Sequence, residues 1–436
     1  MTQNKLITPR KLSGFMELLP SKQVILDDMV SKIRQVYTSA GFMPLDTPVL
    51  ELGEILFAKS GGSIDKEVYS FKRGDTELCM RYDLTVPLAR FVAMNSDNLI
   101  FPFKRFQIGK VFRGERAQKG RFREFIQCDA DIIGLDNLPI VADAECLSLV
   151  DKVFKALNLE IVNHISNRNI LFGFIEGLSL KEKTNDILII LDKLSKIGKQ
   201  EALNELSLLD IKDEDGQKLL SLTSLCGDFD EIIEKIENYS ENETFKKGLS
   251  QLKELSLYLK AYKISPERYC LDLGIIRGHN YYTGTVFEAT LPQHPEFGSV
   301  CGGGRYDNLA GYFTEKKLPG VGLSIGLTRL FDLLDQNNML PSFQKTSATL
   351  EIIPLGDTLL HCITLQSYFS EKIGCQISYG DKSFKAKMKE ANKKGVPYIL
   401  VVGENEVASG IYSLKNMESG QQYNLTKEEC LEFLTK

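Results

Sequence analysis

Arginine, phenylalanine and glutamine side chains lie close together in one short stretch of the chain, residues 106–134. Arg113 follows a strand-like segment, and Arg121 and Arg123 lie at the start of the next one. Guanidinium groups match phosphate oxygens through paired hydrogen bonds, and the ring of Phe125 offers a stacking surface. These residue types favour a flat, anionic ligand such as a nucleotide. A strand with one charged face is equally typical of plain solvated surface.

A hairpin is predicted to position these side chains. Residues 106–111 are strand-like, 116–120 form a polar loop, and a second strand starts at Arg121. Side chains alternate between the two faces of a strand. The even positions after 121 are mostly apolar and predict a core-facing side, with Cys128 as core. The odd positions form the other face: Arg121, Arg123, Phe125, Gln127, Asp129 and Asp131. We therefore predict a long antiparallel hairpin.

This hairpin resembles motif 2 of the class II aminoacyl-tRNA synthetases, in the form found in the histidyl-tRNA synthetase family. The resemblance implies that Arg113 contacts the α-phosphate of ATP and the reacting carboxylate, as a catalytic residue. It implies that Arg121 holds the outer phosphates, that Phe125 lies under adenine, and that Glu115 lies near the adenine amino group. It also assigns two loop residues to the acceptor end of the tRNA: Arg116 and Gln118.

The stretch 83–85 lies between a predicted strand at 77–81 and a predicted helix. Asp83 or Thr85 could cap that helix, and Pro87 fits its first turn. From the residues alone, a helix start is the favoured interpretation. The resemblance implies instead that the stretch holds the α-amino group of histidine, for which a carboxylate and a hydroxyl are suitable partners.

Arg277 lies in a glycine-flanked turn between two apolar strands. A buried cation requires a partner, which could be a structural ion pair or the carboxylate or phosphate of a ligand. The block resembles one that is specific to histidyl-tRNA synthetases, which implies a catalytic, charge-stabilising role for Arg277. It places Tyr281 and Tyr282 in the wall of the histidine pocket. Gly278-His279-Asn280 replaces the family's usual Gly-Leu-Asp, which bears on the imidazole site more than on the reaction. The resemblance as a whole assigns histidine binding to Asp83, Leu84, Thr85, Arg113, Gln127, Asp131, Arg277, Tyr281 and Tyr282.

Two later blocks also resemble the family. Residues 302–304 are consecutive glycines, which allow the backbone to approach a ligand closely. Arg305 and Asp307 either pair with each other or contact a ligand. A small-residue strand that runs into a helix resembles motif 3, which implies that Arg329 contacts an ATP phosphate; Thr328 stands where Glu or Asp is common.

The chain length of 436 residues predicts two or three domains. A helix over 19–39, followed by a strand and Pro48, resembles motif 1, a dimer-interface element, so the resemblance implies a homodimer. The predicted fold class is α+β: a class II synthetase catalytic domain, with an antiparallel sheet flanked by helices and a helical insertion, plus a C-terminal α/β anticodon-binding domain. The predicted bounds are 1–335 for the catalytic domain, about 171–260 for its insertion, 336–347 for a linker and 348–436 for the anticodon-binding domain.

Composition limits the classes of partner and compartment. The net charge is -5, so any nucleic-acid contact must come from local basic patches such as the lysine run at 382–394. The chain has nine cysteines without a CxxC pair and four histidines far apart in sequence, so we expect reduced thiols, a cytoplasmic location and no structural metal. The N-terminal residues show no secretory h-region, and no apolar run is long enough to span a bilayer, so we expect no membrane partner.

The resemblance implies ATP-dependent attachment of L-histidine to tRNA(His) through histidyl-adenylate, with release of AMP and pyrophosphate. Mg²⁺ would accompany ATP, held mainly by the phosphates. The alternative is a catalytically inactive paralogue, a histidine-sensing regulatory subunit of ATP phosphoribosyltransferase. That subunit lacks the C-terminal domain and tends to lose the ATP-binding arginines, whereas this chain has both. A third possibility is a ligand-binding module without turnover.

Overall fold

The computed structural model describes residues 7–58, 67–116, 120–276, 282–307, 309–340 and 346–435. Three residues with predicted roles, Gln118, Arg277 and Tyr281, lie outside this part of the chain. The chain divides into two compact units, Met1–Met16 with Val30–Asn338, and Glu17–Met29 with Met339–Lys436. Each unit is described by itself.

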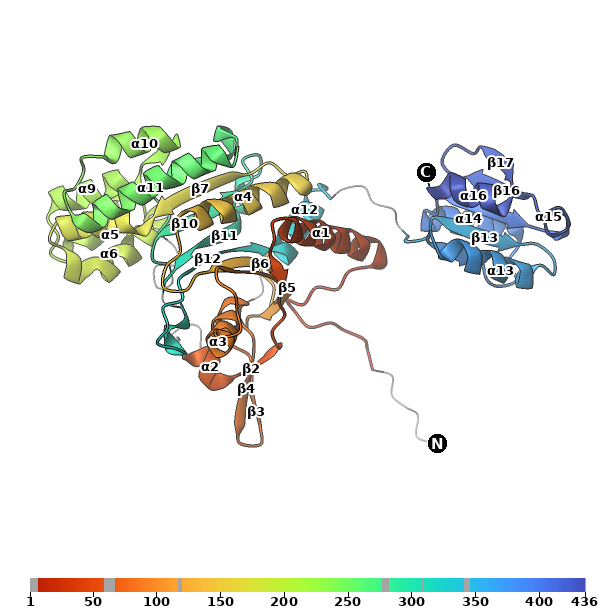
Figure 1. The fold of residues 1–436 in the computed structure, drawn as a ribbon, viewed down its shortest axis with the longest axis horizontal. Coiled ribbons are helices and arrows are strands. Elements are labelled where there is room, and N and C mark those ends of the chain that lie inside the picture. Colours follow the sequence, from red (N-terminus) through yellow and green to blue (C-terminus); the bar gives the residue numbers. More distant parts are fainter. Residues whose placement is uncertain are drawn as a thin grey trace. The chain divides into compact units, whose positions relative to one another are not determined.

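A largely antiparallel sheet forms the centre of the first unit (Figure 1). In the described residues it has nine strands, in the order β1-β5-β6-β12-β11-β10-β7-β9-β8. The pairs β1–β5 and β7–β9 are parallel, and the remaining described pairs are antiparallel. The bounds are β1 Met43–Pro44, β5 Phe103–Phe112, β6 Glu124–Ile133, β7 Val162–Asn167, β8 Cys226–Gly227, β9 Tyr269–Asp272, β10 Thr285–Thr290, β11 Ser299–Tyr306 and β12 Gly320–Gly326.

The predicted hairpin is confirmed as β5 and β6, which pair from Phe103↔Ile133 to Phe112↔Glu124. The second strand begins at Glu124 rather than at Arg121. The reason is that the amide of Arg123 donates to the carbonyl of Gly14, in the N-terminal segment. The alternation is also as predicted, because Cys128 is fully buried on the face opposite to Asp129 and Asp131.

Helices cover the apolar face of β6. The hydroxyl of Tyr37, in α1, donates to the carbonyl of Cys128 at 3.1 Å, and the thiol of Cys146, in α4, lies 3.8 Å from the carbonyl of Val321 in β12. Figure 1 shows α4 lying along the sheet. The opposite face of β6 is thereby left for a ligand. The bounds of these helices are α1 Pro20–Ser39, α4 Val141–Ala156 and α12 Leu327–Gln336.

A small three-stranded sheet, in the order β2-β4-β3, precedes the central hairpin and leads into α3. The predicted strand at 77–81 is observed as β4, and the predicted helix start is observed at Thr85. The bounds are β2 Leu50–Leu52, α2 Gly53–Phe57, β3 Ser70–Arg73, β4 Thr76–Met80 and α3 Thr85–Asn95.

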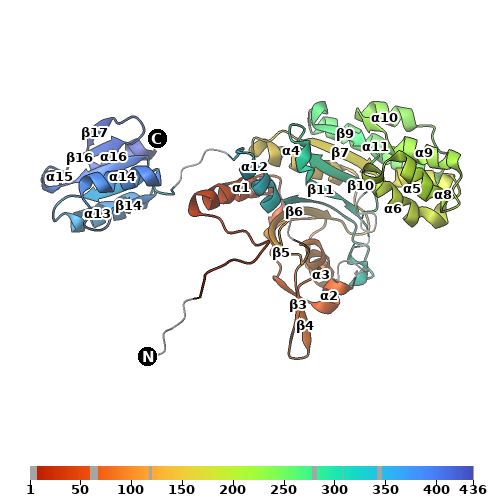
Figure 2. The same ribbon diagram turned by 180° about the vertical axis from the view of Figure 1, so that it is seen from behind.

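A group of helices lies at the β7–β9 end of the large sheet (Figure 2). Helices α5 and α11 pack closely because they meet at glycines: a Cβ on Gly173 would lie 2.1 Å from the amide of Phe245, and one on Gly248 would lie 2.9 Å from the amide of Ile170. The bounds are α5 Arg168–Gly177, α6 Thr184–Asp192, α7 Leu194–Ile197, α8 Lys199–Ser207, α9 Asp213–Thr223, α10 Phe229–Ile236 and α11 Glu243–Ala261. Short 3₁₀ turns cover Lys181–Lys183, Pro266–Arg268, Pro295–Phe297 and Leu309–Tyr312.

The second unit has its own five-stranded sheet in the described residues, ordered β14-β13-β15-β16-β17. Strands β14, β13 and β15 are parallel, which agrees with the α/β class predicted for this domain. Strands β16 and β17 form an antiparallel hairpin that the sequence analysis missed, so the sheet is mixed. The bounds are β13 Leu350–Pro354, α13 Leu359–Ser370, β14 Cys375–Ile377, α14 Phe384–Lys394, β15 Tyr398–Val402, α15 Glu404–Ser409, β16 Tyr412–Asn416, β17 Gln422–Leu425 and α16 Lys427–Thr435. Among the described residues, no helix combines the length and apolar character needed to cross a membrane.

Candidate active site

Two cavities adjoin over the odd-numbered face of β6. The larger has a volume of about 380 Å³ and the smaller about 260 Å³. Four residues line both cavities: Arg113, Gln127, Gly302 and Ser324. The two spaces therefore share a wall, and a ligand group in one can meet a ligand group in the other beside Arg113.

Aromatic rings hold the guanidinium of Arg113 at this shared wall. Its Cζ atom lies 4.3 Å from the ring centroid of Tyr82 and 5.1 Å from that of Phe125. Its Nε donates to the carbonyl of Tyr82 at 3.4 Å. The hydroxyl of Tyr82 donates to Glu67 at 2.9 Å, and burial is the main cause that raises the tyrosine pKa to about 12. A planar cation between two rings is favoured by cation–π attraction and keeps a fixed orientation.

The larger cavity brings together the five residues that were predicted to bind ATP. Arg121 and Glu115 form an ion pair at its rim, with Nη1 and Oε2 3.4 Å apart, and the Arg121 side chain is 59% exposed. Such an exposed pair contributes little to stability, so Arg121 can exchange Glu115 for a phosphate at low cost. Arg329, from the first turn of α12, donates to the carbonyl of Phe297 at 2.7 Å. The full set that lines this cavity is Arg113, Glu115, Arg121, Phe125 and Arg329.

A buried ion pair forms the floor of the smaller cavity. Asp131 lies 2.8 Å from Nη2 of Arg105, whose side chain is fully buried, and it accepts a hydrogen bond from Tyr306 at 2.7 Å. Burial raises the pKa of Asp131 and the charge of Arg105 opposes that rise. The pKa of the neighbouring Asp129 is raised to about 7, mainly because its carboxylate is buried. The charge of Arg105 opposes this rise, and the charge of Asp131 adds to it.

The smaller cavity also presents buried acceptors that still have capacity for a donor. Gln127 lines this cavity and donates its amide to Ser324 at 2.8 Å. Among the described residues, neither Gln127 Oε1 nor Asp129 Oδ1 has a hydrogen-bond partner. Buried acceptors are normally paired, and an unpaired one carries a desolvation penalty. A ligand that brings N–H groups, such as an imidazole or an ammonium, would remove this penalty.

The stretch 83–85 caps a helix and also lines the smaller cavity. The carboxylate of Asp83 accepts from the amides of Thr85 and Val86 at 3.0 and 2.9 Å, so the capping interpretation is confirmed. Asp83 and Thr85 line the smaller cavity as well. The side chain of Leu84 is fully buried, and its carbonyl accepts from Arg105 at 3.3 Å, so it supports the floor rather than lining the cavity.

Tyr282 and the glycines of β11 complete the smaller cavity. Tyr282 lines it, and burial raises the pKa of this tyrosine, so its hydroxyl stays neutral. A Cβ on Gly304 would lie 2.8 Å from the Tyr282 ring, whereas a Cβ on Gly302 would meet only Phe287 O, at 3.8 Å. Gly302 is therefore the glycine that leaves room for a ligand, and Gly304 leaves room for Tyr282.

Of the two alternatives for Arg305 and Asp307, the mutual ion pair is not observed in the described part of the chain. Arg305 is buried and donates to both carboxylate oxygens of Asp143, in α4, and to the carbonyl of Leu138 at 2.8 Å. Asp307 accepts from the hydroxyl of Thr283 at 2.7 Å. The reason is that α4 places a buried carboxylate beside β11, and a buried cation takes the partner that is shielded from water.

Several site residues were not predicted. Arg105 and Ser324 come from the two strands that flank β6, Tyr306 comes from β11 beyond β12, and Asp129 appeared only as a member of the polar face. The observed register of β5 against β6 sets Arg105 opposite Asp131, whereas the predicted strand began one residue later, at 106. Arg116 is exposed and lines neither cavity.

Comparisons with known proteins agree over most of the chain. The family model for histidyl-tRNA synthetase matches residues 14–330, and the model for an anticodon binding domain matches residues 351–436. A histidine–tRNA ligase of Clostridium tetani is 42% identical over 435 residues, which are 98% of this chain and 98% of that protein. The crystal structure of histidyl-tRNA synthetase from Nostoc sp. PCC 7120 matches with a TM-score of 0.91 and 33% identity, covering 98% of this chain and 99% of that one. The structure described as an ATP phosphoribosyltransferase regulatory subunit/histidyl-tRNA synthetase from Bacillus halodurans matches with a TM-score of 0.76 and 21% identity, covering 92% and 99%, which shows a shared fold.

Proposed function

The chain belongs to the histidyl-tRNA synthetase family, and on that premise we propose that it attaches L-histidine to tRNA(His) in two steps. In the first, a carboxylate oxygen of histidine attacks the α-phosphorus of ATP, the bond to the β-phosphate breaks, and pyrophosphate leaves. In the second, the terminal ribose hydroxyl of the tRNA takes the histidyl group from the adenylate, and AMP leaves. The observation that carries this proposal is the pair of adjoining cavities with Arg113 in their shared wall.

The larger cavity is proposed as the ATP site. Arg113 neutralises charge at the α-phosphate, Arg121 and Arg329 hold the outer phosphates, and Phe125 lies under adenine. ATP enters as its Mg²⁺ complex, in which the phosphates hold most of the metal. The chemistry needs no protein nucleophile, because positioning and charge neutralisation lower the barrier for the in-line displacement.

The smaller cavity is proposed as the histidine site. The unpaired acceptors of Gln127 and Asp129 suit the N–H groups of an imidazole, and the carboxylate of Asp83 suits the α-ammonium group. Asp131 is held by Arg105 and Tyr306 and supports this wall. Arg277, outside the described residues, is proposed as the second catalytic cation, and Tyr281 as a further pocket residue.

Two domains are proposed to divide the work. The catalytic domain would cover 1–335 with a helical insertion at about 171–260, and a linker at 336–347 would lead to the anticodon-binding domain at 348–436. The acceptor end of the tRNA would contact the catalytic domain near Arg116 and Gln118. The anticodon of the tRNA would contact the anticodon-binding domain. A homodimer and a cytoplasmic location are parts of the same proposal.

The regulatory-subunit alternative is not favoured. The relative from Clostridium tetani, at 42% identity over nearly the full chain, is a ligase by name. The arginines that the alternative would lose line the larger cavity, and a match to the anticodon binding domain covers the C-terminal end.

The test of the proposed function is ATP–pyrophosphate exchange measured across a panel of amino acids. We expect exchange that depends on histidine, followed by histidine incorporation into tRNA(His) when that tRNA is added. Exchange that is no greater with histidine than with other amino acids would refute the substrate assignment. Binding of histidine and ATP without exchange would refute the catalytic role.

A further inference from the structure

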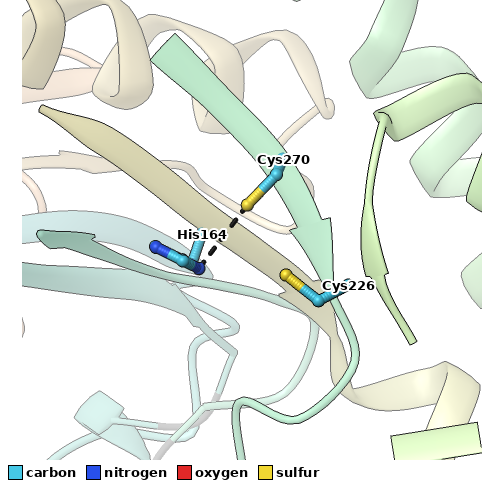
Figure 3. Close-up of side chains that lie close together, drawn as sticks. All are labelled: His164, Cys226 and Cys270. Atoms are coloured by element: carbon cyan, nitrogen blue, oxygen red, sulfur yellow. Dashed lines mark hydrogen bonds between the residues drawn. The ribbon is translucent and has the colours of Figure 1, made fainter. Parts of the chain in front are cut away.

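Three residues of the types that bind transition metals meet on one face of the large sheet, at its β8 edge. His164 lies in β7, Cys226 in β8 and Cys270 in β9, and their candidate ligand atoms all lie within 4.8 Å of one another (Figure 3). The three positions are far apart in the sequence, with no local metal-binding motif. Only the pairing of the strands brings them together.

The strand register explains why these side chains share a face. His164 pairs with Cys270 across β7 and β9, and Cys226 pairs with Asp272 across β8 and β9. Cys270 and Asp272 are two positions apart in one strand, so they point to the same side of the sheet. The register therefore gathers four potential ligands, two thiols, one imidazole and one carboxylate.

The spacing of these groups fits a tetrahedral ion. Zn²⁺ binds thiolate sulfur at ≈ 2.3 Å and imidazole nitrogen at ≈ 2.0–2.1 Å, so a tetrahedral angle separates the two ligand atoms by about 3.6 Å. The observed separation between Cys270 Sγ and His164 Nδ1 is 3.5 Å. The carboxylate oxygen Oδ2 of Asp272 lies 3.0 Å from the same nitrogen but outside the group of three whose ligand atoms are all within 4.8 Å of one another, so the side chain would turn toward the ion to take the fourth position.

Neighbouring groups hold the imidazole and the carboxylate in place. His164 Nε2 lies 3.1 Å from the hydroxyl of Thr290, and the amide of Gly274 donates to Asp272 Oδ1 at 3.0 Å. Without an ion, a proton on Nδ1 is donated to Asp272 Oδ2. In the other tautomer the proton is on Nε2, which donates to Thr290, and the lone pair of Nδ1 is available for a metal. Metal-binding histidines are typically fixed through their second nitrogen in this way.

We propose that His164 Nδ1, Cys226 Sγ, Cys270 Sγ and Asp272 Oδ2 form a zinc site. Both thiols release their protons to solvent when the ion binds. Thiolate and imidazole ligands select zinc over Mg²⁺ or Ca²⁺. Cys226 is exposed, so the ion has a path from solvent. The site lies apart from the two cavities over β6, and the inference does not depend on the proposed function.

The ion would fasten the helical region to the large sheet. Strand β8 is only two residues long and connects α9 with α10, so Cys226 is the contact through which that region would be tied to β9. Four protein ligands leave no open coordination position, which is typical of a structural zinc site rather than a catalytic one. A disulfide fits less well, because Cys226 and Cys270 are diagonal neighbours, whose Cα atoms are ≈ 7–8 Å apart, beyond the usual disulfide range.

Zinc binding to the full-length chain tests the proposal. The reduced protein would be freed of metal with a chelator and then titrated with Zn²⁺ against a chromophoric competitor. We expect one ion per chain, with affinity at least about tenfold weaker in C226S, C270S and H164Q. C375S, which alters a partly buried cysteine of β14, serves as the matched control and should bind zinc like the wild type.

Substitution with Co²⁺ gives a second readout that does not depend on stability. We expect a sulfur-to-cobalt charge-transfer band in the wild type and in C375S, and a much weaker band in C226S. T290V should keep the ligands and fold but weaken zinc binding about 10–100-fold, whereas T290S should retain it. Equal zinc binding by wild type, C226S and C270S would overturn the proposal. Failure of the reduced wild type to bind zinc, with a Cys226–Cys270 disulfide found by mass spectrometry before reduction, would also overturn it.

Discussion

Arg113 shows, at the scale of one residue, why the type of cation matters at this site. Its guanidinium lies between the rings of Tyr82 and Phe125, at the wall shared by the two cavities. We expect R113A to lower histidine-dependent pyrophosphate exchange about 10²–10³-fold, the usual cost of removing one preorganised charge-stabilising group. R113K should rescue little, because an ammonium lacks the planar shape that stacks between rings and binds two oxygens at once.

A matched control for Arg113 is R73A, which removes an exposed arginine of β3 that lines neither cavity. Its exchange rate should equal that of the wild type. If the exchange rate of R113K stays within threefold of that of the wild type, the planar shape of the guanidinium is not required. A requirement for a positive charge at this position would still be consistent with that result.

Asp129 gives a prediction about pH. Burial raises its pKa to about 7 in the folded chain, against ≈ 3.9 when unfolded. The folded state therefore holds a proton that the unfolded state releases, so this group's contribution to stability is complete below pH ≈ 4 and is lost as the pH rises through about 7. The amide of D129N cannot lose a proton, so its free energy of unfolding does not have this pH dependence. We therefore expect the free energy of unfolding of D129N minus that of the wild type to increase as the pH rises from 5 to 8, by up to about 4 kcal/mol.

Urea unfolding of both proteins at several pH values measures this difference. D97N, at an aspartate whose side chain is 89% exposed, is the control and should show a difference that hardly changes over the same range. A constant difference between D129N and the wild type would contradict the raised pKa.

At the scale of the element, the junction of β12 and α12 positions Arg329. The hydroxyl of Thr328, the preceding residue, accepts from the backbone amide of Ile126 in β6 at 2.8 Å and is buried. T328V keeps the shape but leaves that amide unpaired, so we expect a loss of about 1–3 kcal/mol in the free energy of unfolding. T328S keeps the hydroxyl and should lose less. Chemical denaturation measures both, and equal stability of T328V and wild type would show that the hydrogen bond contributes nothing.

Element patterns made part of this site predictable from sequence. Alternation along β6 placed Gln127 and Asp131 on one face and Cys128 on the other, because a strand has a period of two. Partners from other strands were missed: Arg105 depends on the exact register of β5 against β6. The true partner of Arg305 was not among the alternatives considered, because the sequence does not show that α4 brings Asp143 beside it.

The cluster of His164, Cys226 and Cys270 was missed for a similar reason. The expectation of no structural metal was based on the absence of short ligand spacings in the sequence. Such spacings do not reveal candidate ligands that meet only through the pairing of distant strands. In the second unit, the parallel strands agree with the predicted α/β class. The hairpin of β16 and β17 was missed because its strands are only partly apolar and partly exposed.

At the scale of the whole molecule, an acidic chain has to meet an anionic tRNA. The net charge of -5 opposes that encounter, so local basic surface must provide the attraction. Helix α14 carries the densest lysine run, but not all of its lysines are free to contact a tRNA phosphate. Lys387 is buried, and Lys394 lies 3.1 Å from the buried carboxylate of Glu351. Three exposed lysines remain at a spacing of four residues, which places them along one face of the helix: Lys385, Lys389 and Lys393.

This stripe of lysines leads to a prediction that separates the two steps of the proposed reaction. Replacing Lys385, Lys389 and Lys393 together by glutamine should weaken tRNA use at least about tenfold, seen as a higher KM for tRNA(His) in charging assays, because released counterions supply much of the affinity for phosphates. Pyrophosphate exchange needs no tRNA and should not change.

The triple arginine variant keeps the charge and should charge tRNA like the wild type. The dependence of log KM on log salt should also become shallower, by roughly 0.7–0.9 for each tRNA phosphate that a lysine no longer neutralises. If the glutamine variant charges tRNA with an unchanged KM and salt dependence, the stripe is only solvated surface, and the basic region of this unit that meets tRNA must lie elsewhere.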